Sequence, residues 1–224
     1  MISDALTLSF LPRRITEMLR LVLIRPGHSL YEAQGRVQGN LDIPLADEAR
    51  AAVRELAVGL RDSEITAIYS NPCSAAVETA KALAAEFGVK PRSLDELQNV
   101  NHGLWQGLLI EDIREKQPYV YKQWQERPEN VCPPGGEMLG DAAERIEEGL
   151  DWLIKKHRHG GTVGIVVGEP MLSLIRSKLT GAEVGDLWKA AAAPPGAEIF
   201  EVDPVQWRKR EPRAVTPVAV RQGG

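Results

Sequence analysis

The chain has 224 residues and a formal net charge of −4 at pH 7. This length is enough for one large domain with a full hydrophobic core and is short for two. The composition is that of an ordinary globular protein, and the charge gives no indication of a basic surface for nucleic acid. We therefore expect no nucleic-acid partner.

The cysteine content and the N-terminus indicate the compartment. Two cysteines, Cys73 and Cys132, are too few for a disulfide scaffold and indicate free thiols in a reducing compartment. No apolar run approaches the roughly 18 residues that cross a membrane. Residues 1–18 do not form a persuasive signal peptide, because Asp4 comes early and Arg13 follows the apolar part. We expect a cytoplasmic protein with no membrane partner.

The first predicted element after this N-terminal extension is a strand over residues 21–24, the apolar run Leu-Val-Leu-Ile. It ends in a sharp turn at Arg25, Pro26, Gly27 and His28. A loop rich in glycine and polar residues follows at 35–45. Open α/β sheets place ligand sites at the carboxyl ends of such strands. The stretch is either a core strand with a surface loop or a phosphate pocket with Arg25 at its floor.

Two helices flank the next predicted strand, at residues 65–70. The first has an apolar stripe with helical spacing and Asp47 as its expected N-cap, and the second has a similar stripe and ends at Gly88. Strand, helix, strand and helix joined by short connections predict a parallel sheet with helices on its faces. The stripes are Ala49, Val53, Leu56 and Leu60, then Ala76, Ala80, Leu83 and Phe87.

Residues 89–136 are irregular and rich in proline, and we expect two short helices and long loops that form a lid or wall over a site. A long amphipathic helix is predicted over residues 139–153 and a buried strand over 162–167. Pro170 is expected at the first helical position of the next helix, and residues 197–202 alternate as a strand. We divide the chain into an extension at 1–18, a domain at 19–205, and a tail or edge strand at 206–224.

Several short motifs together resemble the histidine phosphatase superfamily, the phosphoglycerate mutase-like proteins. Arg25 and Gly27 match the turn after that family's first strand, and further matches follow in the family's order and spacing. The resemblance covers residues 19–205 and implies a three-layer α/β/α sandwich with a mostly parallel sheet. The further matches are Gly35, Arg36, Gln38, Gly39, Asp42, Pro44, Leu45, Ser70, Pro72, Thr79, Ala80, Gly103, Trp105, Gly107 and Pro134 to Glu137.

The resemblance also implies a chemistry that this sequence departs from. In the family a histidine accepts the phosphoryl group, two arginines and a second histidine hold it, and an acid protonates the leaving oxygen. Here Pro26 stands at the nucleophile, Ala75 at the second arginine, Asn99 at the acid and Glu169 at the second histidine. Of the core set only Arg25 remains. Because a lone buried arginine is costly, we predict that Arg25 and Glu169 form an ion pair.

Other polar residues are also candidates for the site. His28 is the rival candidate for the nucleophile. The alternative interpretation is that His28 is a polar loop residue at the mouth of the pocket. His102 is a candidate ligand residue near the same mouth. Cys73 lacks the arginine six positions later that a cysteine phosphatase needs, since Thr79 stands there, so we expect a packing role. His157 and His159 lie among cations, which favours a solvated helix end, and we expect neither a metal nor a cofactor.

Three hypotheses of function follow. The first is a catalytically inactive protein, a pseudophosphatase, that acts as a binding or regulatory module. The second is a phosphomonoester phosphatase or mutase with displaced catalytic residues, in which His28, Arg25 and Glu169 act. The third is a small-molecule sensor that uses the same pocket. The partner is expected to be another protein or a small anionic or neutral ligand, and homo-oligomerisation is left open. The expected ligand-binding residues are Arg25, His28, Asn99, His102 and Glu169, with Trp105 added for the sensor.

Overall fold

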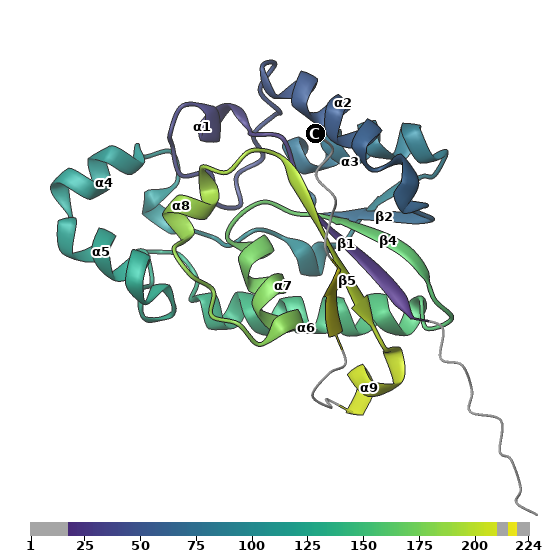
Figure 1. The fold of residues 1–224 in the computed structure, drawn as a ribbon. Coiled ribbons are helices and arrows are strands. Elements are labelled where there is room, and N and C mark those ends of the chain that lie inside the picture. Colours follow the sequence, from purple (N-terminus) through teal and green to yellow (C-terminus); the bar gives the residue numbers. More distant parts are fainter. Residues whose placement is uncertain (1–17, 210–214, 219–224) are drawn as a thin grey trace, which may run out of the picture.

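The computed structural model describes residues 18–209 and 215–218. In this part of the chain six strands form one sheet in the order β3-β2-β4-β1-β5-β6, with helices on both faces (Figure 1). The predicted three-layer α/β/α fold with a mostly parallel sheet is confirmed. The strands are β1 (Leu19–Arg25), β2 (Ala67–Ser70), β3 (Pro91–Ser93), β4 (Gly161–Val166), β5 (Gly196–Val202) and β6 (Val215–Val218).

Strand β1 lies inside the sheet. It pairs in parallel with β4 and antiparallel with β5, where Arg25 stands opposite Gly196. Strand β2 joins β4 and β3 in parallel, and β6 pairs antiparallel with β5 at the edge. Because helices cover both faces, β1 is apolar without alternation, as the sequence predicts for a strand buried on two sides.

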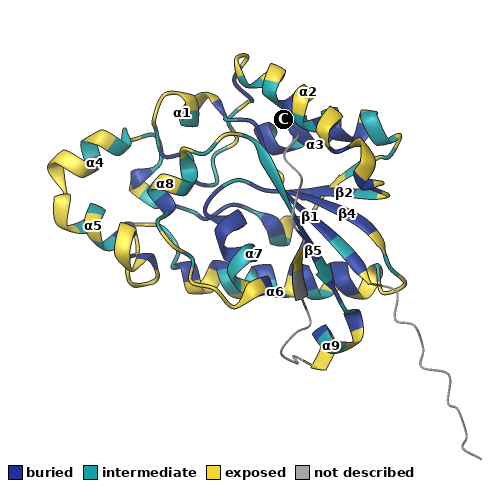
Figure 2. Cartoon of the chain, viewed as in Figure 1, coloured by how far each residue is buried: buried dark blue, intermediate teal, exposed yellow. Residues whose placement is uncertain are grey.

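Two helical layers bury the two faces of the sheet. Helices α2 (Ala49–Gly59) and α3 (Ser74–Phe87) pack on the face that carries Val22 and Ile24. Helices α6 (Leu139–Lys156) and α7 (Met171–Thr180) pack on the opposite face, which carries Leu21 and Leu23. The strands and the inward sides of these helices are the buried part of the chain (Figure 2).

Two expected helix starts are wrong by one residue. Asp47 does not cap α2, because the N-cap is Glu48 with helical backbone angles, and the Asp47 carboxylate instead accepts from Arg50 Nε at 3.0 Å. Pro170 is the N-cap of α7 rather than its first helical residue, and the Glu169–Pro170 peptide bond is cis. Glu169 therefore lies between the end of β4 and the start of α7.

The irregular region contains the two predicted short helices, α4 (Ile110–Lys116) and α5 (Pro118–Glu126), which project from the sheet and are largely exposed (Figures 1 and 2). Three short helices were not predicted: α1 (Leu30–Ala33), α8 (Leu187–Ala191) and α9 (Pro204–Lys209). The sequence contains a signal for α1, because Ser29 and Glu32 form a capping box. Single 3₁₀ turns occur at Arg61–Ser63, Asp95–Leu97, Gly103–Trp105 and Pro128–Asn130.

Most of the predicted N-terminal extension, residues 1–17, lies outside the described residues. Of the helices that the structure does describe, none has the length and apolar character that a membrane span requires.

Gly103 packs closely against the loop that contains Pro134. Its φ is +49°, and a Cβ atom there would lie 2.2 Å from the Pro134 carbonyl oxygen. We expect Gly103→Ala to lower the free energy of unfolding by at least about 2 kcal/mol, because backbone atoms would have to move. Chemical denaturation measures the change.

Gly140→Ala is the matched control, because Gly140 is exposed in α6 and a Cβ atom added there would meet nothing within 4 Å. It should raise the free energy of unfolding by about 0.5–1 kcal/mol. Equal effects of the two substitutions would contradict the proposed contact.

Candidate functional site

The ion pair predicted between Arg25 and Glu169 is present at the carboxyl end of β1. Arg25 Nη2 lies 2.5 Å from Glu169 Oε1, and the two residues are only 7% and 8% exposed. The backbone N–H of Ser173, in the first turn of α7, donates to Glu169 Oε2 at 3.1 Å. Both carboxylate oxygens of Glu169 therefore have partners, and the buried arginine is neutralised by a side chain from the end of the neighbouring parallel strand.

The turn after β1 is packed against α3. The Gly27 N–H donates to Thr79 Oγ1 at 3.2 Å, and the Thr79 hydroxyl donates to the Ala75 carbonyl oxygen at 2.8 Å. A Cβ atom on Gly27 would lie 2.6 Å from Leu45 Cδ1, so a larger residue here would have to displace the Leu45 side chain. Ala75 is buried at the start of α3 and has no polar atom on its side chain with which to hold a phosphate.

Asn99 fixes the loop that follows β1. Its Nδ2 donates to the Gly39 carbonyl oxygen at 2.9 Å, and its Oδ1 accepts from the Val100 N–H at 3.0 Å. Gly39 has a φ of +63°, the left-handed conformation that glycine adopts without strain. Asn99 thus uses both ends of its amide to hold backbone, and its role as a ligand residue stays a prediction.

A cavity of about 700 Å³, which we call the charged cavity, opens beside Arg25. It lies between the ends of β1 and β5, helix α7 and the segment 184–197. Arg176 and Glu198 form a second ion pair on its wall, with Arg176 Nη2 2.5 Å from Glu198 Oε1. Its charged lining residues are Arg25, Glu169, Arg176, Asp186, Lys189 and Glu198.

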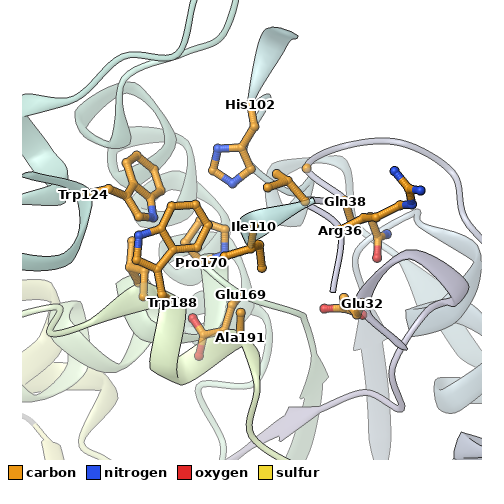
Figure 3. Close-up of a pocket in the computed structure, with 13 residues that line it drawn as sticks. Glu32, Arg36, Gln38, His102, Ile110, Trp124, Glu169, Pro170, Trp188 and Ala191 are labelled. Atoms are coloured by element: carbon orange, nitrogen blue, oxygen red, sulfur yellow. The ribbon is translucent and has the colours of Figure 1, made fainter. Parts of the chain in front are cut away.

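A smaller hollow of about 50 Å³, which we call the aromatic pocket, also has Glu169 in its lining (Figure 3). Most of its wall is apolar and comes from the loop after β1, helices α4 and α5, and helix α8. The apolar lining residues are Val37, Ile110, Trp124, Pro170, Leu187, Trp188 and Ala191, and the polar ones are Glu32, Arg36, Gln38, His102 and Glu169.

His102 enters the aromatic pocket as a neutral group. It is 7% exposed, and its ring stands edge-on to Trp124 with centroids 5.2 Å apart. Burial lowers the pKa of His102 to about 4, so the imidazole is uncharged at neutral pH. Its Nδ1 has no hydrogen-bond partner among the described residues. The structure thus brings His102 and Glu169 together in one pocket.

His28 lies beside the charged cavity without lining it. Its ring is half-buried, and Nε2 is 2.9 Å from the carbonyl oxygen of Ala193, a wall residue of that cavity. Trp105 is 3% exposed and packs behind Trp124 with ring centroids 5.6 Å apart. Trp105 therefore supports the wall of the aromatic pocket rather than facing its interior.

The structure places the remaining candidates away from both hollows. Cys73 is buried, and burial, with a smaller effect of Asp42, raises the pKa of its thiol to about 11. A thiol is therefore present at neutral pH, in agreement with a packing role. His157 Nε2 lies 3.1 Å from Tyr69 Oη. Within residues 18–209 and 215–218, no group of three or more His, Cys, Asp or Glu side chains could hold a metal ion.

Sequence reasoning missed Trp124, Trp188, Arg176 and Glu198. Trp188 lies in α8, and the only local signal for this helix is Asp186, whose carboxylate accepts from the N–H groups of Trp188 and Lys189. Arg176 and Glu198 are 22 residues apart in sequence, and only the packing of α7 beside β5 pairs them.

Comparison with known proteins identifies the family. Residues 21–213 match the histidine phosphatase superfamily (branch 1), and the chain belongs to this family. It is 29% identical to phosphoserine phosphatase 1 of Hydrogenobacter thermophilus, over 76% of the chain and 81% of that protein. It is 28% identical to the metal-independent phosphoserine phosphatase of Arabidopsis thaliana, over 75% of the chain and 71% of that protein.

Solved structures agree in fold. The mycobacterial glucosyl-3-phosphoglycerate phosphatase in complex with inorganic phosphate superposes with a TM-score of 0.72. The sequence identity is 22%, and the match covers 91% of this chain and 97% of that one.

The hypothesis of a catalytically inactive protein is contradicted by these relatives, whose names are those of phosphatases. That hypothesis took the loss of histidine at position 26 as the loss of the reaction. In the structure Arg25 lies at the end of β1 and lines a cavity large enough for a metabolite. The alternative of an active phosphatase is the better supported one.

The Arg25–Glu169 pair gives a stability prediction. We expect Glu169→Leu to lower the free energy of unfolding by about 3–5 kcal/mol, because it leaves a buried guanidinium without its partner. The double variant Arg25→Met/Glu169→Leu should recover most of this loss. As a control, Glu86→Gln in the partly exposed Arg61–Glu86 pair should cost less than about 1 kcal/mol. Additive effects in the Arg25–Glu169 cycle, measured by urea denaturation, would contradict the pairing.

His102 gives a pH prediction. Because its folded pKa of about 4 lies below the ordinary value of 6.5, the unfolded chain binds its proton first as the pH falls. The contribution of His102 to the free energy of unfolding should therefore be lost between pH 6.5 and 4. The loss approaches about 1.4 kcal/mol per pH unit at its steepest. The difference between wild type and His102→Phe across this range isolates the effect, and parallel curves would refute it.

Proposed function

We propose that the protein hydrolyses a phosphomonoester and does so without the two catalytic histidines of its family. Pro26 and Glu169 stand at those two positions, so the reaction cannot use the histidines of the family. The observation that carries the proposal is the buried guanidinium of Arg25, which the end of β1 presents to the charged cavity. A fixed cation in a partly enclosed cavity stabilises the charge of a transferring phosphoryl group.

Glu169 is proposed as the acid. A phosphate that binds Arg25 brings negative charge close to this carboxylate, and two such charges about 4 Å apart repel by roughly 4 kcal/mol at an effective dielectric near 20. Uptake of a proton by Glu169 removes the repulsion. The protonated carboxyl group can then give its proton to the oxygen of the departing alcohol.

His28 is proposed as the nucleophile or the base. As a base, its imidazole takes a proton from the water whose oxygen bonds to phosphorus, while the bond from phosphorus to the alcohol oxygen breaks. As a nucleophile, it bonds to phosphorus itself and water releases the phosphate in a second step. Either role requires the ring to leave the Ala193 carbonyl oxygen, 2.9 Å away, and turn toward Arg25.

The names of the relatives support this chemistry, since a phosphoserine phosphatase and a glucosyl-3-phosphoglycerate phosphatase both act on phosphomonoesters. Small anionic ligands, a cytoplasmic location and homo-oligomerisation stay predictions for this chain.

The proposal predicts the effects of three substitutions on phosphate release from several phosphomonoesters. Arg25→Ala should lower kcat/KM by at least about 100-fold, because the cation that binds the transferring group is lost. His28→Ala should abolish turnover. Cys73→Ala should leave turnover unchanged, because the Cys73 thiol takes no part.

Contaminating phosphatases would contribute equally to all preparations, so a loss confined to Arg25→Ala and His28→Ala assigns the activity to this chain. Circular dichroism shows whether each variant is folded, and Arg25→Lys, which keeps the charge, gives a second test. A wild-type protein without turnover, or one whose turnover survives Arg25→Ala, would refute the proposal.

A further inference from the structure

One side of helix α6 faces away from the sheet. The inward side packs on the sheet through residues that include Ile146, Leu150 and Leu153, and the opposite side is open to solvent (Figures 1 and 2). The exposed side chains recur three or four residues apart, which places them on one face of the helix. We call this face the α6 stripe, and its residues are Asp141, Glu144, Glu148, Trp152, Lys155 and Lys156.

The charges of the α6 stripe are not used inside the chain. Within residues 18–209 and 215–218, none of them forms an ion pair. Charges on the flanks of the same helix are paired, since Arg145 binds Glu137 and Glu147 binds Lys178. The stripe therefore presents its charges to another molecule, while the flanks of α6 hold the domain together.

The helix dipole accounts for only part of this charge pattern. It favours acids in the first turn and cations in the last turn, which fits Asp141 at one end and Lys155 and Lys156 at the other. The effect of the dipole falls off within one turn of each end. It gives no reason for Glu144 and Glu148, which lie further into the helix.

An exposed tryptophan lies between the acidic and the basic part of the stripe. Trp152 is 41% exposed, more than any other tryptophan of the chain. Its ring stands edge-on to the buried Tyr69 ring with centroids 5.8 Å apart, and Lys156 Nζ lies 4.4 Å from the Trp152 ring centroid. The indole is thus held in one position before any partner arrives. Rigid aromatic side chains of this kind are typical central residues of protein interfaces.

The α6 stripe is complementary to itself. Its amino-terminal part is acidic and its carboxyl-terminal part is basic, with Trp152 between them. If two copies of α6 lie antiparallel, the acids of each copy face the cations of the other. A two-fold axis then generates both halves of the contact from one surface. A parallel arrangement would place like charges opposite each other.

We propose that the α6 stripe is the surface through which two copies of this chain form an antiparallel dimer. With the two-fold axis level with Leu150, Trp152 of one copy packs beside Glu148 of the other. Lys155 of each copy then lies between the levels of Glu144 and Glu148 of the other copy.

The size of this contact makes the dimer a weak one. The helix has 18 residues and is about 27 Å long. Two such helices bury less than the roughly 1,200 Å² of a standard interface. We expect half of the chains to be dimeric at a concentration on the order of 100 μM.

The dimer leaves the candidate site open. The residues of the α6 stripe line neither the charged cavity nor the aromatic pocket. The inference is therefore independent of the proposed phosphatase activity, and its test requires no turnover.

Sedimentation equilibrium of the full chain, at concentrations from about 10 μM to about 1 mM, measures the Kd of the dimer. Trp152→Ala should raise this Kd at least about tenfold, because the central aromatic contact is lost. An increase in NaCl from about 50 mM to about 500 mM should raise the Kd severalfold, because salt screens charge pairs at the rim of a small interface.

Charge reversal tests the antiparallel arrangement. Glu144→Lys/Glu148→Lys makes most of the stripe basic, and Lys155→Glu/Lys156→Glu makes it acidic. Each variant alone should be monomeric, because like charges then face each other. An equimolar mixture of the two should form a dimer at least as stable as that of the wild type.

Glu111→Lys/Glu115→Lys is the matched control. It makes the same change of charge, with the same spacing, on the exposed side of helix α4, which lies away from α6 (Figure 1). This variant should dimerise like the wild type, and circular dichroism shows whether every variant is folded. If Trp152→Ala is unfolded, the two charge-reversed variants decide the question.

A protein that stays monomeric up to about 1 mM overturns the inference. The stripe then has another occupant, either residues 1–17 of the same chain or a different protein. A dimer that neither Trp152→Ala nor charge reversal weakens forms through another surface and also overturns it. Charge-reversed variants that do not associate with each other when mixed overturn the antiparallel arrangement.

Discussion

The ion pair between Arg25 and Glu169 is the constraint on which the site depends. A guanidinium buried at the end of a central strand needs a counter-charge, and Glu169, from the strand-to-helix connection next to it, supplies one. The pair ties β1 to β4 and α7 at the edge of the sheet where ligands bind in open α/β folds. It also means that an anion bound at Arg25 would compete with the Glu169 carboxylate for the guanidinium.

Near this pair, side chains that pack or hold the backbone stand where the family has polar catalytic side chains. Ala75 and Asn99 are both buried, and the Asn99 side chain is hydrogen-bonded to the loop after β1. Ala75 lies at the start of α3, while the charged cavity on the side of α8 is lined by three cations and three carboxylates.

The sequence predicted the sheet, its main helices and the Arg25–Glu169 pair because each rests on a strong local pattern or on a motif with fixed spacing. Prediction from the sequence failed where an element is too short to show a periodic apolar pattern. Helix α8 has five residues, too few for an apolar stripe to be recognised, yet it supplies Trp188. The hypothesis of inactivity failed for another reason: a missing side chain at position 26 says which group cannot react and does not say which other groups are near the phosphate.

The sequence by itself determined the fold and the residues at the family positions, because apolar periodicity and motif spacing are properties of neighbours along the chain. It also determined that Arg25 would need a carboxylate. Only the tertiary structure decided that Glu169 is in the lining of both hollows, and that Arg176 meets Glu198. Those relations join residues brought together by the packing of α7 and α8 beside β5, and no pattern within one element encodes how two elements pack.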